Sequence, residues 1–211
     1  WHWPRIPTRP TTRWKSRTAM PIEVSRETFR PAEPSDAPQI EALAQRIWWH
    51  AYPPIIGVAQ TRYMLELMYR PEQIRTDMAA GHRYCLLLLQ GEPRGFHALE
   101  TKHEGQPGRA RLHKLYLDPA LHGRGLGQAM LQQAMADALE HGATLMDLTV
   151  NKYNKQAIQA YRRAGFAQVG EVVKPIGQGY VMDDYLMART LSRQRPSLDT
   201  TNAERSHDTH H

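Results

Sequence analysis

Cysteine is almost absent from this sequence: Cys85 is the single one among 211 residues. One cysteine cannot form an internal disulfide, and chains without disulfides are typical of reducing compartments, so we expect a cytoplasmic protein. Cys85 lies within an apolar stretch. This position predicts an inert thiol in the core rather than a nucleophile that carries an acyl group.

Long apolar runs are also absent. The stretch Cys85–Leu89 is long enough for a buried strand, whereas a membrane-spanning helix needs about 18 consecutive apolar residues. Residues 1–20 contain arginine, proline and tryptophan with no apolar segment behind them, so no secretory signal is expected. The sequence therefore predicts no membrane partner.

The folded part lacks an excess of charge of either sign. The net charge of +6 comes mainly from residues 1–20, which hold five basic residues and no acidic one. Residues 193–211 hold three of each, which leaves 19 basic and 18 acidic residues in 21–192. We predict one folded domain at 21–192, between a disordered basic leader at 1–20 and a disordered polar tail at 193–211. We expect no nucleic-acid binding, and only the basic leader favours that alternative.

Apolar periodicity and turn residues predict the order of the elements. Ile40, Leu43, Ala44, Ile47 and Trp48 follow the spacing of a helix with one buried face. The full pattern predicts a strand, three helical stretches, three strands, a helix, a strand, a short helix and two strands. They lie at 28–32, 36–52, a stretch through 63–68 that breaks at Pro71, 72–80, 83–90, 95–102, 110–117, 126–140, 144–150, 154–164, 166–173 and 180–191. This order predicts a mixed α/β fold with a partly antiparallel sheet.

The most informative stretch is 112–127, where an apolar strand leads into a glycine-rich corner and then a helix. Gly123, Gly125 and Gly127 allow the backbone to approach a ligand closely at the helix start. The first N–H groups of a helix have no intrahelical partner and carry the positive end of the helix dipole. With Arg124 beside them, they predict a binding site for a phosphate or pyrophosphate.

Two familiar nucleotide motifs do not fit this corner. The spacing is Gly-x-Gly-x-Gly rather than the Gly-x-Gly-x-x-Gly of dinucleotide-binding folds, and the acidic residue that ends the second strand of such folds is missing. The Lys-Ser/Thr pair of a P-loop is absent as well.

A second block follows, in which the strand 148–150 precedes Asn154, Ala157, Tyr161 and the pair Gly165-Phe166. Together the glycine corner and this block resemble the GNAT superfamily of N-acetyltransferases, and the resemblance covers roughly residues 27–191. It implies a GNAT-like sheet, flanked by helices, with splayed central strands. His122 departs from the pattern, because the family usually has Gln or Arg there.

The resemblance implies that acetyl-CoA is the co-substrate. Its pantetheine arm would lie in the gap between the splayed strands, pair with the backbone of Leu115, Tyr116 and Leu117, and accept a hydrogen bond from Asn154. Its pyrophosphate would bind the corner and the helix start, at Gly123, Arg124, Gly125, Leu126, Gly127 and Gln128. No metal is expected.

Direct acetyl transfer needs a neutral amine, a group that holds the oxyanion and an acid that protonates the leaving thiolate. The resemblance implies that Tyr161 is this acid, and its ordinary pKa near 10 suits the task. The alternative for Tyr161 is a core aromatic residue on an amphipathic helix. His113 is the candidate base, since an imidazole with an ordinary pKa of about 6.5 can accept a proton near neutral pH. His97, Glu100 and Asp147 are rivals for that role.

The acceptor is predicted to be a primary amine of a small molecule, of polyamine or amino-acid type. Asp183 and Asp184 favour a cationic acceptor, although carboxylates in a strand are also explained by exposure or by ion pairs with Arg162, Arg163 or Lys174. Aromatic residues of the helical region either line the acceptor pocket or belong to the core; they are Trp48, Trp49, Tyr52 and Tyr63. The alternatives are a protein N-terminus or lysine as acceptor, and a non-catalytic acyl-CoA-binding module. Family members often pair through their last strands, so a homodimer is also considered.

Overall fold

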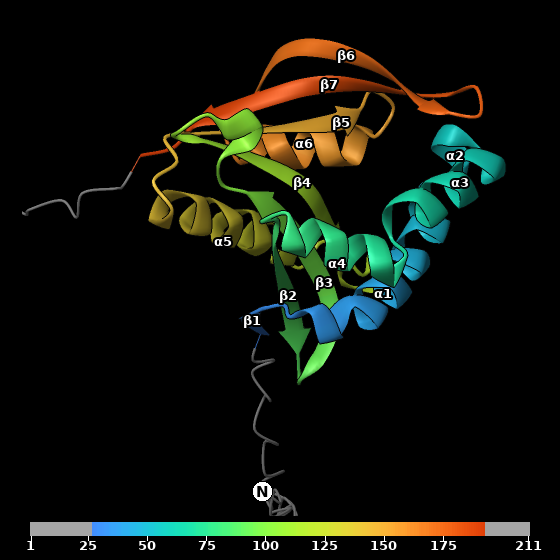
Figure 1. The fold of residues 1–211 in the computed structure, drawn as a ribbon, viewed down its shortest axis with the longest axis horizontal. Helices are drawn as coiled ribbons and strands as arrows, with labels where there is room; N and C mark the ends of the chain where they lie inside the picture. Colours follow the sequence, from blue (N-terminus) through green and yellow to red (C-terminus); the bar gives the residue numbers. More distant parts are fainter. Residues whose placement is uncertain (1–26, 193–211) are drawn as a thin grey trace, which may run out of the picture.

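A computed structural model describes residues 27–192, which form one seven-stranded sheet with helices on both faces (Figure 1). The predicted leader at 1–20 and tail at 193–211 lie outside the described residues. The strand order is β1-β2-β3-β4-β5-β7-β6, and β4 and β5 are the parallel pair. The predicted mixed, partly antiparallel sheet is confirmed.

The elements follow the predicted order closely. The strands are β1 (Glu27–Pro31), β2 (Arg83–Leu89), β3 (Glu92–Glu100), β4 (Arg109–Leu117), β5 (Leu145–Asn151), β6 (Ala167–Gly177) and β7 (Tyr180–Thr190). The helices are α1 (Ala37–Ala51), α2 (Pro53–Ile56), α3 (Val58–Met68), α4 (Pro71–Ala79), α5 (Leu126–Glu140) and α6 (Lys155–Arg163). Among the helices of this described part, none is long and apolar enough to cross a bilayer.

Both hairpin turns are tighter than their sequences indicate. We place the first turn at Gly91–Pro93, but it comprises Gln90 and Gly91, and Pro93 lies in β3 beside an irregularity in the pairing. The last two strands are likewise joined by Gln178 and Gly179 alone, so β6 runs past its predicted end at 173. All four turn residues have positive φ, which matches the twist of a two-residue hairpin. The pairs β2–β3 and β6–β7 therefore remain paired up to the two residues of their turns.

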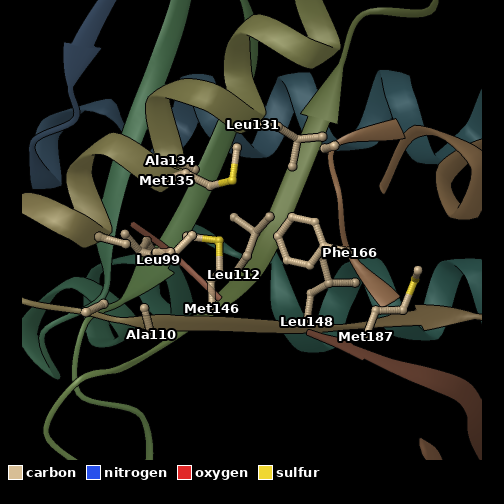
Figure 2. Packing of buried hydrophobic residues seen from close by; sticks show 14 of the residues in the cluster. Leu99, Ala110, Leu112, Leu131, Ala134, Met135, Met146, Leu148, Phe166 and Met187 are labelled. Atoms are coloured by element: carbon tan, nitrogen blue, oxygen red, sulfur yellow. The ribbon is translucent and has the colours of Figure 1, made fainter. Parts of the chain in front are cut away.

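Hydrophobic cores lie on both faces of the sheet. The first contains Ile40, Ile47 and Met64 of the α1–α4 group, packed on Leu86 and Phe96 of the sheet. The opposite face holds a small cluster with Met130 and the main core beneath α5. Figure 2 shows its Leu131 and Met135 above strand residues, with Phe166 alongside. The methionine and tryptophan stripes of α1 and α3 serve the first core, so their periodicity reports packing.

The parallel pair β4–β5 is short, and it is fixed by an ion-pair cluster. The two strands pair at Arg109–Leu145, Ala110–Met146 and Arg111–Asp147, and not beyond. The carboxylate of Asp147 is buried and accepts hydrogen bonds from the guanidinium groups of both Arg109 and Arg111. Charge-assisted bonds of this kind hold the two strands together at one end.

We expect that Asp147→Asn destabilises the fold, because it removes the buried anionic partner of two partly buried arginines and leaves Arg109 only the exposed Glu104. Breaking a buried ion pair in this way costs about 3 kcal/mol. Denaturant unfolding monitored by circular dichroism measures the change. Asp137→Asn is the matched control: Asp137 pairs with Arg83, whose side chain is 42% exposed, and such surface pairs contribute less than about 1 kcal/mol. Equal losses in the two variants would contradict a special role for Asp147.

Candidate active site

After Arg111, which pairs with Asp147 of β5, the β4 strand has no further partner on that edge among the described residues. Leu115, Tyr116 and Leu117 pair with His97, Phe96 and Gly95 of β3 on their other edge. This is the splay that the resemblance implies, and it leaves peptide groups of β4 available to an extended ligand. An unpaired edge of a strand is suited to bind another extended chain through its main-chain groups.

A β-bulge marks the closed end of the splay. Leu99 of β3 pairs with Leu112 and Ala98 pairs with Lys114, so His113 is the extra residue on β4. Leu112 packs beneath α5, whereas the Lys114 ammonium reaches Asp77 of α4, 2.7 Å away. The bulge therefore changes which residues of β4 face the α1–α4 side, a common use of bulges beside active sites.

The glycine corner takes the conformation that a phosphate site needs. Gly123 and Gly125 have φ of 77° and 81°, and Gly125 is the residue that precedes α5. Residues with a Cβ rarely adopt this left-handed conformation. Gln128 differs from its neighbours, because its backbone N–H already donates to the Gly125 carbonyl and its side chain donates to the carbonyl of Ala160. This glutamine joins α5 to α6.

Asn154 lies where α6 begins. Its side-chain oxygen accepts a hydrogen bond from the backbone N–H of Ala157, at 3.1 Å, which makes it the N-cap of the helix. Its side chain also lies beside the phenol of Tyr52 at the end of α1. Asn154 thus connects the helical layer of one face to the start of α6, a function that its place in the sequence motif did not indicate.

A cleft of about 370 Å³ opens beside these residues. It is lined by His50 and Ile55 on one side, by His122 of the glycine corner, and by the segment 153–156 that starts α6. The His122 ring bonds both the Leu117 carbonyl and the Gln156 side chain, each at 3.2 Å. His122 therefore bridges the end of β4 and α6 at the edge of the cleft.

Tyr161 is partly buried on α6 and packs edge-on against Phe166, with ring centroids 6.0 Å apart. Burial, with a smaller contribution from Tyr52, raises the pKa of Tyr161 well above its ordinary value. The phenol is therefore protonated over the whole physiological range, as a general acid must be. Its contact with the core also fits the alternative of a packed aromatic residue.

His113 belongs to a cluster of polar side chains. Its Nε2 lies 3.0 Å from Oε2 of Glu100, and Nδ1 of His103 lies 2.7 Å from the same oxygen. The ring of His82, which follows α4, stacks on His113 at 4.5 Å. Burial lowers the pKa of His113 to about 4, against the opposing effect of Glu100. The imidazole is therefore neutral at pH 7.

The hydrogen bonds of this cluster determine which imidazole nitrogens carry protons. Burial disfavours the charged form of Glu100, but the hydrogen bonds from His103 and His113 outweigh it and lower the pKa of this carboxyl group. An ionised carboxylate only accepts hydrogen bonds, so the imidazole nitrogens that face it carry the protons. Nδ1 is then the nitrogen of His113 with a free lone pair.

The rival bases are less well placed. His97 alternates with Phe96 and Ala98 of the α1–α4 core, so its ring points to the α5 face, where burial lowers its pKa to about 4. Asp147 is engaged by two arginines. Glu100 holds two histidines and is in position to orient His113 rather than to replace it. Cys85 is partly buried, and burial raises the pKa of its thiol to about 11, as expected of an inert thiol.

The two acidic residues of β7 have different environments. Asp183 pairs with Lys152 at 2.6 Å, not with the arginines or Lys174 that the sequence offered as partners. Asp184 is buried, and burial raises its pKa to about 6 even though a hydrogen bond from Thr149 works in the opposite direction. Asp184 also acts on the phenol of Tyr52, which places it near Asn154 and the splay.

Comparison with known proteins decides the family. The model of the acetyltransferase (GNAT) family matches residues 41–166, which include the splayed strands, the glycine corner and Tyr161. The chain belongs to the GNAT acetyltransferase family. The predicted enzyme class, an acyltransferase that uses acetyl-CoA as co-substrate, is confirmed with it.

The curated relatives are N-acetyltransferases. An uncharacterized N-acetyltransferase of Mycobacterium tuberculosis, Rv2669, is 27% identical over 159 residues, which is 74% of this chain and 99% of that protein. An uncharacterized N-acetyltransferase of Methanocaldococcus jannaschii, MJ1207, is 35% identical over 89 residues, and this chain spans 39% of its length. A mycothiol acetyltransferase of Propionibacterium freudenreichii is 33% identical over 75 residues, 36% of this chain and 24% of that enzyme.

The solved structures share the fold. The PaiA N-acetyltransferase of Thermoplasma acidophilum, in complex with coenzyme A, has a TM-score of 0.64 at 17% identity and covers 78% of this chain and 99% of its own. The ribosomal-protein-S18-alanine N-acetyltransferase of Escherichia coli has a TM-score of 0.60 at 21% identity, over 82% and 99%. These TM-scores show that the chain shares their fold.

We expect Gly125→Ala to raise the KM for acetyl-CoA about tenfold, because a left-handed alanine costs roughly 1–2 kcal/mol and the helix start shifts to relieve it. Steady-state kinetics measures this change. Gly91→Ala is the control: Gly91 has φ of 82° in the β2–β3 turn, and neither glycine has an atom within 4 Å of an added Cβ. An equal KM in the two variants would show that the corner does not bind the co-substrate.

Asp184→Asn should stabilise the protein above pH 6 and make no difference below about pH 4. A carboxyl group whose pKa is raised in the folded state binds protons more tightly there than in the unfolded chain, so its burial disfavours folding as the pH rises from about 4 through 6. Thermal unfolding of both proteins between pH 4 and pH 8 tests this. A constant difference in Tm across that range would contradict the assignment.

Proposed function

We propose that this enzyme transfers the acetyl group of acetyl-CoA directly to the primary amine of a small molecule. The observation that supports this most strongly is the splay itself. It has the glycine corner at one end, the His113 bulge at the other, and Asn154 with Tyr161 on the helix that follows β5.

Acetyl-CoA would bind along this opening. The pantetheine arm would pair with the backbone edge of Leu115, Tyr116 and Leu117 that has no partner strand, where the Leu117 carbonyl is at present bonded by the His122 ring. The amide of Asn154 would donate to the arm. The pyrophosphate would accept hydrogen bonds from the backbone N–H groups of the corner, near Arg124. These N–H groups, of Gly123 through Gly127, make no hydrogen bond to the described residues. Gln128 is left out of this set, because its N–H is already bonded.

The transfer step needs two proton movements. The amine attacks the thioester carbonyl, the C–N bond forms, and the C–S bond breaks with the electron pair on sulfur. Tyr161 would donate its phenolic proton to that thiolate. Nδ1 of His113 would accept the proton that the amine loses. Glu100 would hold Nε2–H of the imidazole, as the carboxylate of a catalytic triad orients its histidine.

Two features favour a small cationic acceptor. The first is Asp184, a buried carboxylate close to the splay that has no cationic partner of its own among the ion pairs of the described residues. The second is the helix α3, which contacts the β6–β7 hairpin. In α3, Gln60 donates to the Val181 carbonyl at 2.8 Å and the Tyr63 hydroxyl donates to the Ile176 carbonyl, so α3 is joined to the β6–β7 hairpin (Figure 1). A surface covered by a helix in this way suits a small amine better than a folded protein.

The acceptor is identified by measuring thiol release from acetyl-CoA with polyamines, amino acids, aminoglycosides and short peptides. We expect turnover with one small-molecule class. Turnover with peptides alone would replace the small-molecule proposal by a protein acceptor. Tight binding of acetyl-CoA without turnover on any amine would support a non-catalytic acyl-CoA-binding module.

Tyr161→Phe should lower kcat by about 10²- to 10⁴-fold, the usual contribution of a general acid, with little change in the KM for acetyl-CoA. The loss should persist above the pKa of the acceptor amine, because the phenol assists the breaking of the C–S bond and not the deprotonation of the amine. Tyr180→Phe is the control on β7. A kcat that falls less than about tenfold would assign Tyr161 to the core alone.

His113→Gln should also lower kcat, but its effect should shrink once the pH exceeds the pKa of the acceptor amine, which is then neutral without help from a base. This pH dependence separates a base from a residue that only supports the bulge. An unchanged ratio of wild-type to variant rates across the pH series would argue against His113 as the base.

A further inference from the structure

The residues around His113 form more than a hydrogen-bonded pair. Candidate ligand atoms of His82, Glu100 and His113 all lie within 4.8 Å of one another. They come from three segments: the turn after α4, the end of β3 and the bulge of β4. We propose that these three side chains bind a divalent transition metal ion of the zinc type, and that the bound ion inhibits acetyl transfer.

The donor set agrees with this chemistry. Two imidazoles and one carboxylate are common ligands of zinc, which binds imidazole nitrogen at about 2.0–2.1 Å and carboxylate oxygen at a similar distance. Nε2 of His113 and Oε2 of Glu100 are 3.0 Å apart. In a tetrahedral site they would separate slightly, which small rotations of the side chains allow. A water molecule would complete the coordination.

An unsatisfied atom points to a missing ligand. Nδ1 of His82 is buried and has no hydrogen-bond partner among the described residues. A buried polar atom without a partner costs free energy, and coordination to an ion would remove that cost. One ligand nitrogen of His82 lies within 4.8 Å of the ligand atoms of His113 and Glu100. The rings of His82 and His113 are stacked with an interplanar angle of 11°, so one ring would rotate for both nitrogens to point at the same ion.

The surroundings support the three ligands. Nδ1 of His103 donates to Glu100 at 2.7 Å, and the side chain of His103 is only 12% exposed. A bond of this type orients a ligating carboxylate. The side chains of His113 and Glu100 are 25% and 26% exposed, which leaves an ion a path from solvent. The ammonium of Lys114, which follows His113 in the chain, is paired with Asp77 at 2.7 Å.

Metal binding would change which nitrogen of His113 carries the proton. In the metal-free protein Nε2 carries the proton that Glu100 accepts, and Nδ1 has the free lone pair. An ion on Nε2 displaces that proton, and the neutral ring keeps a proton only on Nδ1, so neither nitrogen can then accept one from an amine. This inhibitory effect rests on the proposed function of His113, whereas the binding of the ion does not.

Binding is tested on the full chain after treatment with a chelator. Zn²⁺ is titrated by calorimetry, and Co²⁺ serves as a probe whose visible bands report tetrahedral coordination. We expect His82→Ala and Glu100→Gln each to lower the affinity at this site at least tenfold and to remove the Co²⁺ bands, because even the loss of an outer-shell partner costs 10- to 100-fold.

His141→Ala is the matched control. It removes a histidine that bonds Asp137 and is not one of the three proposed ligands, and it keeps the terminal histidines at 2, 207, 210 and 211 that all variants share. This variant should bind like the wild type. Equal affinities and spectra for the wild type and His82→Ala would overturn the proposed site.

The inhibition has its own measurement. Zn²⁺ should inhibit the wild type at concentrations that match its binding affinity, while His82→Ala should retain its basal activity and resist the ion. If Zn²⁺ binds the wild type at the cluster but does not inhibit it, the inhibitory part is wrong and the role of His113 as base is contradicted. Loss of binding in His82→Ala still supports the site in that case.

Discussion

The interaction on which the site depends is the contact of Asp147 with Arg109 and Arg111. A parallel pair of strands in a sheet normally continues until one strand ends. Here the pairing stops after Arg111, while both strands continue. The ion-pair cluster fixes the joined end, so the separation further along becomes a stable feature of the folded state. The backbone edge that would receive the pantetheine arm exists because of this separation.

The sequence predicts the parts of the fold whose signals are local. Glycines at 123 and 125 require positive φ, and their conformation agrees with the expected corner. The helix stripe that includes Ile40 and Trp48 is confirmed as core. The two hairpin turns were placed less well, because Gln90 and Gln178 adopt left-handed conformations that glutamine seldom favours, so the turn residues were not recognisable.

The polar contacts of the site were harder to predict, since they depend on distant segments. His82 and His103 have no sequence pattern that relates them to His113, and they meet only because a turn, a bulge and a short helical segment converge. The absence of a metal site from the sequence-based expectations has the same cause: zinc motifs are recognised when the ligands are closely spaced. The place of Asn154 in a motif likewise gave no indication of its contact with Tyr52.

The cores on opposite faces of the sheet also divide the chain by function. Leu121 and Leu126, which flank the glycine corner, belong to a small cluster beside α5, and β5 and α6 contribute to the main core beneath that helix. The helices α1 to α4 supply the core of the other face, and the cores of the two faces share mainly β3 and β4. Under the proposed function, substitutions in residues 37–80 would alter the acceptor side while the backbone that would bind the co-substrate stays in place. Such an arrangement lets an acetyltransferase acquire a new acceptor during evolution without losing its ability to use the same acyl donor.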